Sequence, residues 1–190
     1  MNIRSIRFAA LLVMLATPVL AHSGHEASGF AHPFTGLDHL LAMVGVGLWA
    51  SMLAVKRPAA AYLVPASFIV MMLVGAAAGF AGIKLPLTEA AIVASVLILG
   101  AFIMTAVRLP SLAAMAIVGL FAVFHGYAHA IEAPTSGTGL YILGFVAATA
   151  LLHAAGLGLG WVARRSLGDV AIRALGGAVM AGGALVLIAN

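Results

Sequence analysis

Two short stretches of this sequence concentrate side chains that can bind a metal ion. The first brings His32, Asp38 and His39 together at the start of an apolar run. Imidazole nitrogen and carboxylate oxygen suit divalent transition metals, and the thioether of Met43 would add a softer ligand. A metal site is one interpretation of this stretch. The other is that Asp38 caps or hydrogen-bonds a neighbouring helix while His39 packs with its polar atoms satisfied.

The second stretch closes another apolar run, with His125, His129 and Glu132 four and three residues apart. This spacing places all three side chains on one face of a helix. Ionisable groups are costly inside a membrane, so three of them on one face of an otherwise uncharged helix favour a functional site over simple packing.

Three further histidines are weaker candidates. His153 lies in the middle of a later apolar run, where it could receive an ion or form a hydrogen bond to a neighbouring helix. His22 and His25 follow the N-terminal apolar segment, where they could chelate a metal weakly or belong to a polar tail.

Composition indicates an integral membrane protein. The chain has 190 residues, of which 64% are hydrophobic and 7% charged, with a mean hydropathy of +1.20. Apolar runs of about 20 residues recur, as in membrane-spanning helices. The absence of cysteine excludes disulfides, thiolate metal sites and iron–sulfur clusters. Lys and Arg fall between the apolar runs, which indicates control of topology and not a surface for nucleic acid.

The N-terminal residues 1–21 are typical of a cleaved export signal. Arg4 and Arg7 precede an apolar core over 8–20, and the small residue Ala21 ends the segment. We therefore expect residues 22–190 to form a single transmembrane domain.

The predicted fold is all-α, a polytopic membrane protein with six transmembrane helices. The expected spans are 33–54, 60–82, 87–107, 111–131, 139–162 and 169–189. If the spans alternate in direction, most basic residues of the loops fall on one side and Lys84 falls on the other. The positive-inside rule assigns the more basic side to the cytoplasm. Both mature termini would then lie outside, in agreement with a cleaved signal.

Glycines of the second and fifth spans predict close helix packing. Gly75 and Gly79 form a small-xxx-small pair, and Gly156, Gly158 and Gly160 follow one another in the fifth span. Such residues let helix backbones approach in lipid.

With these residues in view, the sequence resembles the HupE/UreJ family, bacterial membrane proteins regarded as nickel, and sometimes cobalt, permeases associated with hydrogenase or urease maturation. The family's first-span pattern, H-P-x-x-G-x-D-H-x-x-x-M-x-x-x-G-x-x-A, is met in full from His32 to Ala50. Its fourth-span pattern, F-H-G-x-A-H-G-x-E, is met from Phe124 to Glu132 except that Ala130 stands where glycine is usual.

The resemblance implies a multi-pass protein of the bacterial inner membrane that is not an enzyme and has no permanent cofactor. Ni²⁺ or Co²⁺ would be the transported ion, and a partner protomer could help to line its path. The implied metal-handling residues are His32, Asp38, His39, His125, His129 and Glu132. No P-loop pattern is present, so direct use of ATP by this chain is not expected.

Other functions remain open on the residues alone. A membrane metal-binding sensor or receptor would need the same ligands. An intramembrane metalloenzyme would need more histidine boxes or a His-Glu-x-x-His arrangement, whereas Gly126 follows His125. A haem carrier could use axial histidines on two helices, and in a purely structural protein the histidines would only pack.

Overall fold

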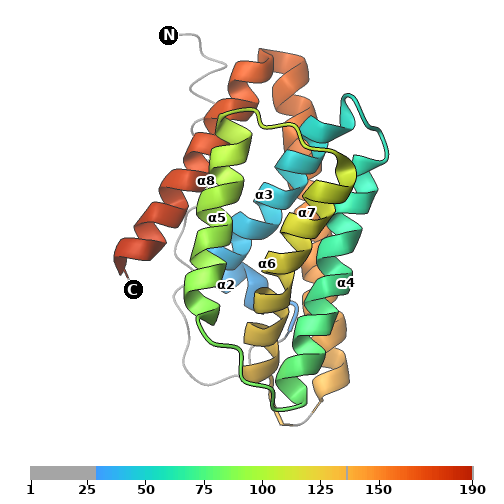
Figure 1. Ribbon diagram of the computed structural model, residues 1–190, viewed down its shortest axis with the longest axis vertical. Coiled ribbons are helices and arrows are strands. Elements are labelled where there is room, and N and C mark those ends of the chain that lie inside the picture. Colours follow the sequence, from blue (N-terminus) through green and yellow to red (C-terminus); the bar gives the residue numbers. More distant parts are fainter. Residues whose placement is uncertain (1–28, 136, 190) are drawn as a thin grey trace.

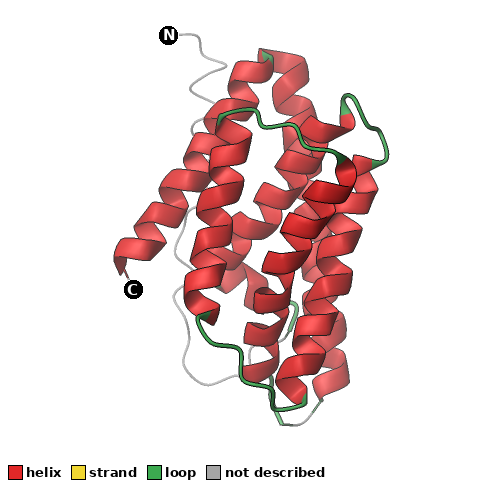
Figure 2. Ribbon diagram, in the orientation of Figure 1, coloured by secondary structure: helices red, strands yellow, loops and turns green. Residues whose placement is uncertain are grey.

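The computed structural model of the chain describes residues 29–135 and 137–189, and this part of the chain is helical with no strand (Figures 1 and 2). The all-α prediction is confirmed for these residues. In chain order the helices are α2 (His32–Thr35), α3 (Leu37–Ala54), α4 (Ala60–Phe80), α5 (Thr88–Met104), α6 (Ser111–Ile131), α7 (Thr138–Leu167) and α8 (Asp169–Ala189).

Five of the described helices are long and apolar enough to cross a membrane, namely α3, α4, α6, α7 and α8. The remaining apolar helix, α5, has 17 residues, which is near the lower limit of about 17–25 residues for a spanning helix. The chain is thus a multi-pass membrane protein. The predicted signal over residues 1–21, together with His22 and His25, lies outside the described residues.

Helix boundaries differ from the predicted spans by three or more residues at three places. The first span was expected to run unbroken from residue 33, but Gly36 is extended, with φ −93° and ψ 119°, and separates α2 from α3. Helix α5 ends at Met104 and not near 107, because Ala106 has a positive φ of 57°. Helix α7 continues to Leu167, five residues beyond its predicted end, and stops at Gly168.

Helix α3 is the centre of the bundle. It contacts each of the other described helices, and Figure 1 shows it behind and between α5 and α6. In α3, 67% of the residues are buried, against 28–39% in the most apolar windows of the other four long helices. The helix that carries Asp38, His39 and Met43 is therefore shielded from lipid by the rest of the chain.

Three helix pairs pack backbone to backbone at glycines. A Cβ at Gly47 of α3 would collide with the carbonyl of His153 in α7, and one at Gly156 with the carbonyl of Val44. Gly75 and Gly126 join α4 to α6 in the same way, and Gly100 and Gly176 join α5 to α8. The predicted role of Gly75 and Gly156 is confirmed. The prediction for Gly158 is wrong, because a Cβ there would meet no atom within 4 Å.

Four arginines gather at one end of the bundle, which we call the basic end. Arg57 donates to the carbonyl of Leu109 at 3.4 Å, and Arg173 donates to the carbonyl of Met104 at 2.8 Å. Arg108 and Arg164 both pair with Asp169, at 3.8 and 2.8 Å. The start of α3, the end of α6 and the start of α7 lie at the opposite end, which is the lower end in Figure 1.

The close approach of α3 and α7 gives a matched test of packing. We expect Gly156→Ala to destabilise the protein by about 1–3 kcal/mol, because the added methyl group is forced against the α3 backbone. Gly158→Ala, two residues away in the same helix, should leave stability unchanged or raise it slightly, since alanine is the better helix former. Thermal unfolding of both purified variants in detergent measures the difference. Equal melting temperatures would show that the Gly47–Gly156 contact is unimportant.

Candidate metal site

His32 is held at the end of the bundle by the short helix α2 and the segment before it. Thr35 donates a hydrogen bond to the His32 carbonyl at 2.8 Å. A Cβ on Gly144 of α7 would lie 2.5 Å from the Phe30 nitrogen, so the glycine lets the segment before α2 lie directly on α7. The imidazole of His32 then reaches Glu132, just after α6, with 2.8 Å between Nε2 and Oε2.

Asp38 and His39 form a second unit in the first turn of α3. The Oδ1 atom of Asp38 accepts hydrogen bonds from the backbone nitrogen of His39 at 2.7 Å and from its Nδ1 at 2.9 Å. A Cβ on Gly36 would lie 2.8 Å from that Oδ1 and 3.3 Å from Nδ1. Glycine at position 36, where the chain is extended between α2 and α3, therefore leaves room for this carboxylate–imidazole contact.

His125 and His129 project inward from α6 and are fully buried. Nδ1 of His125 lies 3.0 Å from the carbonyl of Phe121, one turn earlier, to which it donates. The ring of His129 stacks on Phe145 of α7, with centroids 4.7 Å apart and planes 3° from parallel. The predicted common face of these two residues is observed, and it points at α3 and α2.

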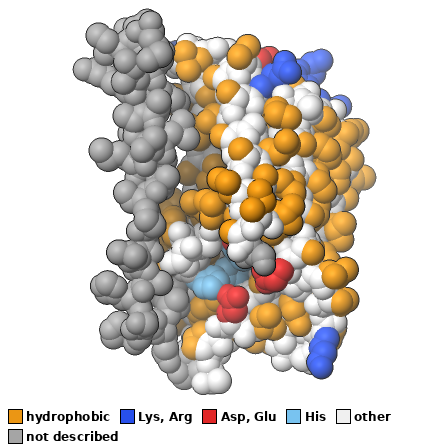
Figure 3. All heavy atoms as spheres, turned by 90° about the vertical axis from the view of Figure 1, so that its left-hand side faces the viewer, with side chains coloured by type: hydrophobic (Ala, Val, Ile, Leu, Met, Phe, Trp, Pro, Cys, Tyr) orange, Lys and Arg blue, Asp and Glu red, His pale blue; other side chains and the backbone are white. Residues whose placement is uncertain are grey.

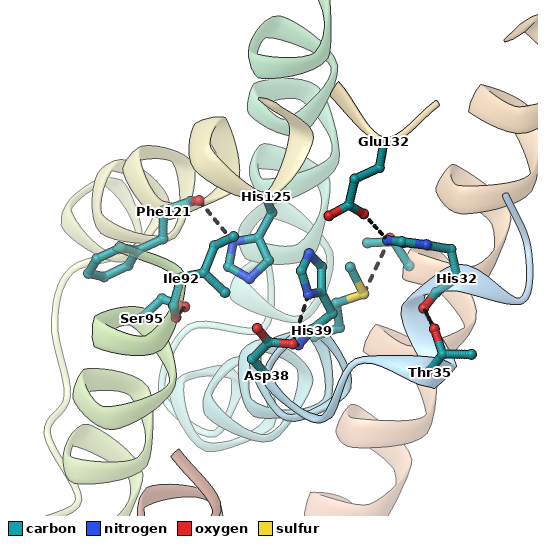
Figure 4. A network of polar contacts seen from close by, with 11 residues as sticks. His32, Thr35, Asp38, His39, Ile92, Ser95, Phe121, His125 and Glu132 are labelled. Carbon is teal, nitrogen blue, oxygen red and sulfur yellow. Dashed lines mark hydrogen bonds and ion pairs between the residues drawn. The ribbon is translucent and has the colours of Figure 1, made fainter. Parts of the chain in front are cut away.

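These elements bring four histidine rings into one cluster, which we call the histidine cluster: His32, His39, His125 and His129. The centroid of the His39 ring lies 5.1 Å from that of His125 and 5.0 Å from that of His129. The His32 ring lies 4.9 Å from His129 and 6.0 Å from His39. Figure 4 shows His39 between His125 and His32, with Asp38 and Glu132 at its edges. Two stretches about 90 residues apart in sequence thus meet at one place.

Several nitrogen atoms of this cluster are buried without a hydrogen-bond partner. They are Nε2 of His39, Nε2 of His125 and both ring nitrogens of His129. In His39 and His125 the other nitrogen, Nδ1, faces a carboxylate or a carbonyl. This fixes the tautomer and leaves the Nε2 lone pair free, as in histidines that bind metals. An unpaired buried polar atom is costly, so the free nitrogens indicate a ligand-binding role.

The ligand atoms do not yet converge on one point. Within residues 29–135 and 137–189, no group of three or more His, Cys, Asp or Glu side chains is arranged to hold a metal ion. The rings meet edge to face, and Nε2 of His32 is paired with Glu132. Binding of an ion by three of these residues therefore requires side-chain rotation. Where His32 is one of the three, the His32–Glu132 contact must also be lost.

Glu132 and His32 form the accessible edge of the cluster. Their side chains are 48% and 21% exposed, while His125 and His129 are fully buried. Figure 3 shows histidine and acidic side chains together on the surface near the lower end of the molecule, below a hydrophobic zone. The hydrogen bond with His32 lowers the pKa of the Glu132 carboxyl below its usual value, so the edge keeps a negative charge in mildly acidic solution.

His153 lies outside the cluster. It is buried in α7, where Nδ1 faces the carbonyl of Met43 at 2.8 Å and Nε2 has no partner. The ring of Phe68 separates it from the cluster, with centroids 5.0 Å from His153 and 5.4 Å from His125. Met43 itself is fully buried one turn beyond His39.

Sequence reasoning missed the contribution of α7 to the histidine cluster. Phe145 supports the ring of His129, and the ring of Tyr141 lies 6.2 Å from that of His32. The Tyr141 hydroxyl is buried without a partner. The only signal was the four-residue spacing of these two aromatic residues, which ordinary packing also produces.

Glu89, in the first turn of α5, shares with Asp38 an open depression of about 410 Å³ beside α8.

Comparison with known proteins places the chain in a family. A family model described as HupE / UreJ protein matches residues 10–186. The chain belongs to the HupE/UreJ family. Protein HupE from Rhizobium leguminosarum bv. viciae is 43% identical over 190 residues, an alignment that covers 96% of this chain and 97% of that protein. No solved structure matches the chain significantly.

Both patterns that carry the family resemblance lie at the histidine cluster. The first supplies His32, Gly36 and the Asp38–His39 unit, and also Gly47 of the α3–α7 contact. The second supplies His125, His129 and Glu132, and Gly126 of the α4–α6 contact. In this HupE/UreJ protein, candidate ligands and helix-packing glycines therefore alternate along the same helices.

The Asp38–His39 contact predicts a graded effect on metal binding. We expect Asp38→Ala to weaken Co²⁺ binding by about 10–100-fold, because His39 loses the acceptor that fixes its tautomer. Asp38→Asn keeps an acceptor oxygen and should lose less. Titration of the purified protein with Co²⁺, followed by visible absorption, measures both. Asp169→Asn, at the opposite end of the bundle, is the control, and equal affinities for all four proteins would contradict the assignment.

Proposed function

We propose that this chain is a permease that moves a divalent transition-metal ion, Ni²⁺ or Co²⁺, across the bacterial inner membrane. One observation carries the proposal: the histidine cluster places unpaired ring nitrogens from α3 and α6 side by side within an apolar helical bundle. Ionisable groups at membrane depth are costly and mark ion pathways. Membership of the HupE/UreJ family, whose members are regarded as nickel permeases, supports the same conclusion.

The gradient of exposure across the cluster suggests the order in which residues meet the ion. Glu132 and His32 are accessible and carry the negative charge that attracts a cation. His39 and His129 come next, and His125 lies one turn deeper on α6. An ion that leaves water exchanges its hydration shell for these nitrogen and oxygen ligands, and each step must bind weakly enough to release it.

The ligand set favours borderline metals without selecting one of them. Imidazole and carboxylate bind Ni²⁺ and Co²⁺, and they also bind Zn²⁺ and Cu²⁺. Cu²⁺ generally binds such sites more strongly than Ni²⁺ does, so affinity alone does not select nickel. Selection must therefore come from geometry. Several side chains must rotate together to bind an ion. Because each metal prefers a different arrangement of ligands, this rotation can select one metal over another.

In this proposal all six apolar helices from α3 to α8 span the membrane, and the basic end of the bundle faces the cytoplasm. The histidine cluster and both mature termini then face the outside, so that the ion is captured there and released inward. His22 and His25, close to the mature N-terminus, are candidates for an initial weak capture. A second protomer could complete the path. Transport proceeds by facilitated diffusion or is coupled to an ion gradient.

Uptake of Ni²⁺ into liposomes tests the proposal. With the mature protein reconstituted and a metal-sensitive dye trapped inside, we expect saturable Ni²⁺ uptake. Uptake should fall to the level of empty liposomes in His39→Ala and in His129→Ala, because each variant removes a ligand from a different helix. Asp169→Asn is the control for reconstitution and should transport normally.

The opposite result separates transport from sensing. If the protein binds Ni²⁺ in detergent but liposomes containing it take up no more than empty ones, the permease proposal is wrong. A membrane metal sensor or receptor, which needs the same ligands without a path, would then be the better interpretation.

Acid should inhibit uptake. Imidazole binds a metal only when the ligating nitrogen is unprotonated, so uptake should decrease as the external pH falls from about 7.5 to about 5.5. The pKa of Glu132 is lowered, so this carboxylate remains ionised over that range and does not cause the decrease. Initial rates at several external pH values, with the internal pH clamped, measure the effect. A rate that stays flat over this range would show that capture of the ion does not depend on an imidazole that is open to external protons.

A further inference from the structure

Two methionine sulfurs meet a single hydroxyl group just beyond the histidine cluster. The Thr149 hydroxyl of α7 donates toward the sulfur of Met43 at 3.4 Å and lies 3.7 Å from the sulfur of Met72. All three side chains are fully buried. They come from three different helices, α3, α4 and α7, which surround this level of the bundle.

This hydrogen bonding is unusual for a threonine in a helix. Hydroxyl groups inside helices commonly bond a carbonyl three or four residues earlier, as Ser51 and Ser95 do here. Thr149 instead directs its hydroxyl away from its own helix and toward the two sulfurs. The packing of α3, α4 and α7 therefore turns the polar atom of Thr149 and both thioethers toward one shared position.

The position of this group is defined by its neighbours. Met43 is one turn beyond His39 on α3. The Met72 backbone lies directly against Gly126, the residue after His125. Along α7, His153 is one turn beyond Thr149, and its Nδ1 faces the Met43 carbonyl. Along the helices, the two methionines and Thr149 thus lie at a level between His39 of α3 and His153 of α7.

We infer that Met43, Met72 and Thr149 form a second metal-binding position, a thioether position that receives a soft or borderline cation between the histidine cluster and His153. Thioether sulfur is a soft, uncharged ligand that binds Cu⁺ and Ag⁺ well and Ni²⁺ weakly. This inference rests on the proposed permease function for its role in transport. For Ni²⁺, a weaker position after a strong imidazole site promotes onward release, as conduction through successive sites requires.

The ordinary alternative is that both methionines only fill space. Methionine packs well into irregular gaps because its side chain is flexible and polarizable. Filling space does not require the sulfurs to respond to a metal. The two interpretations therefore differ in what happens to the sulfur atoms when a soft ion is added.

The methyl groups bonded to these sulfurs provide the readout. With methyl-¹³C methionine incorporated into the purified full-length protein in detergent, Ag⁺ is the probe, since it is soft and diamagnetic. We expect the methyl signals of Met43 and Met72 to shift together on addition of Ag⁺. The signal of Met52, which is buried in the same helix as Met43, should not move. Met43→Leu should abolish the shift at Met72, because one sulfur alone binds weakly.

A transport measurement completes the test. Ag⁺ should inhibit Ni²⁺ uptake into liposomes, and the Met43→Leu/Met72→Leu double variant should need about tenfold more Ag⁺ for half inhibition, since leucine keeps the volume and removes the soft ligand. Met52→Leu is the matched control and should behave as the unaltered protein.

The outcomes separate this inference from the permease proposal. Methyl signals of Met43 and Met72 that move no more than that of Met52 would overturn the thioether position, even if Ni²⁺ uptake is observed. Concerted shifts in a protein that transports no Ni²⁺ would support the position and contradict the permease.

Discussion

The contact between α3 and α7 at Gly47 and Gly156 is the constraint on which the candidate site depends. Because neither residue has a side chain, the two backbones touch, and the Met43 carbonyl comes within hydrogen-bonding reach of His153. The same approach places Thr149 against the Met43 sulfur and Phe145 under His129. Candidate metal ligands are thus positioned by the absence of side chains elsewhere on the same helices.

A second organising feature is the pairing of each fixed imidazole with an acceptor. Asp38 holds His39, the Phe121 carbonyl holds His125, and the Met43 carbonyl holds His153. Each contact uses Nδ1 and presents an unpaired Nε2, so the directions of these three lone pairs are set before any ion arrives. His32 differs, since its Nε2 is occupied by Glu132 at the exposed edge. The ion must therefore compete for the outermost ligand and finds the inner nitrogens free.

The sequence was sufficient to predict the helical class and most helix positions, because long uncharged runs have few alternatives in a membrane. The meeting of the two histidine-bearing stretches agrees with spans that alternate in direction, because the start of the first span and the end of the fourth then lie on the same side of the membrane. The sequence did not predict the break at Gly36, where the backbone is extended, because the close approach of the Asp38 carboxylate to this residue exists only in the folded chain. The convergence of Met43 and Met72 could not be predicted either, because a methionine in an apolar run gives the same sequence pattern whether it only packs or also binds a metal.

Because α3 is enclosed by its neighbours, we expect the outer surface of the molecule and the central helix to differ in how well they tolerate substitutions. Exposed apolar residues such as Leu140, Val170 and Ile188 face outward, where one hydrocarbon side chain can replace another with little effect on the fold. Residues of α3 meet protein on nearly every side, so even an isosteric replacement must be matched by its partners. We therefore expect substitutions, fluorescent labels and cross-linkers to be tolerated on the outer surface and to be harmful in the central helix.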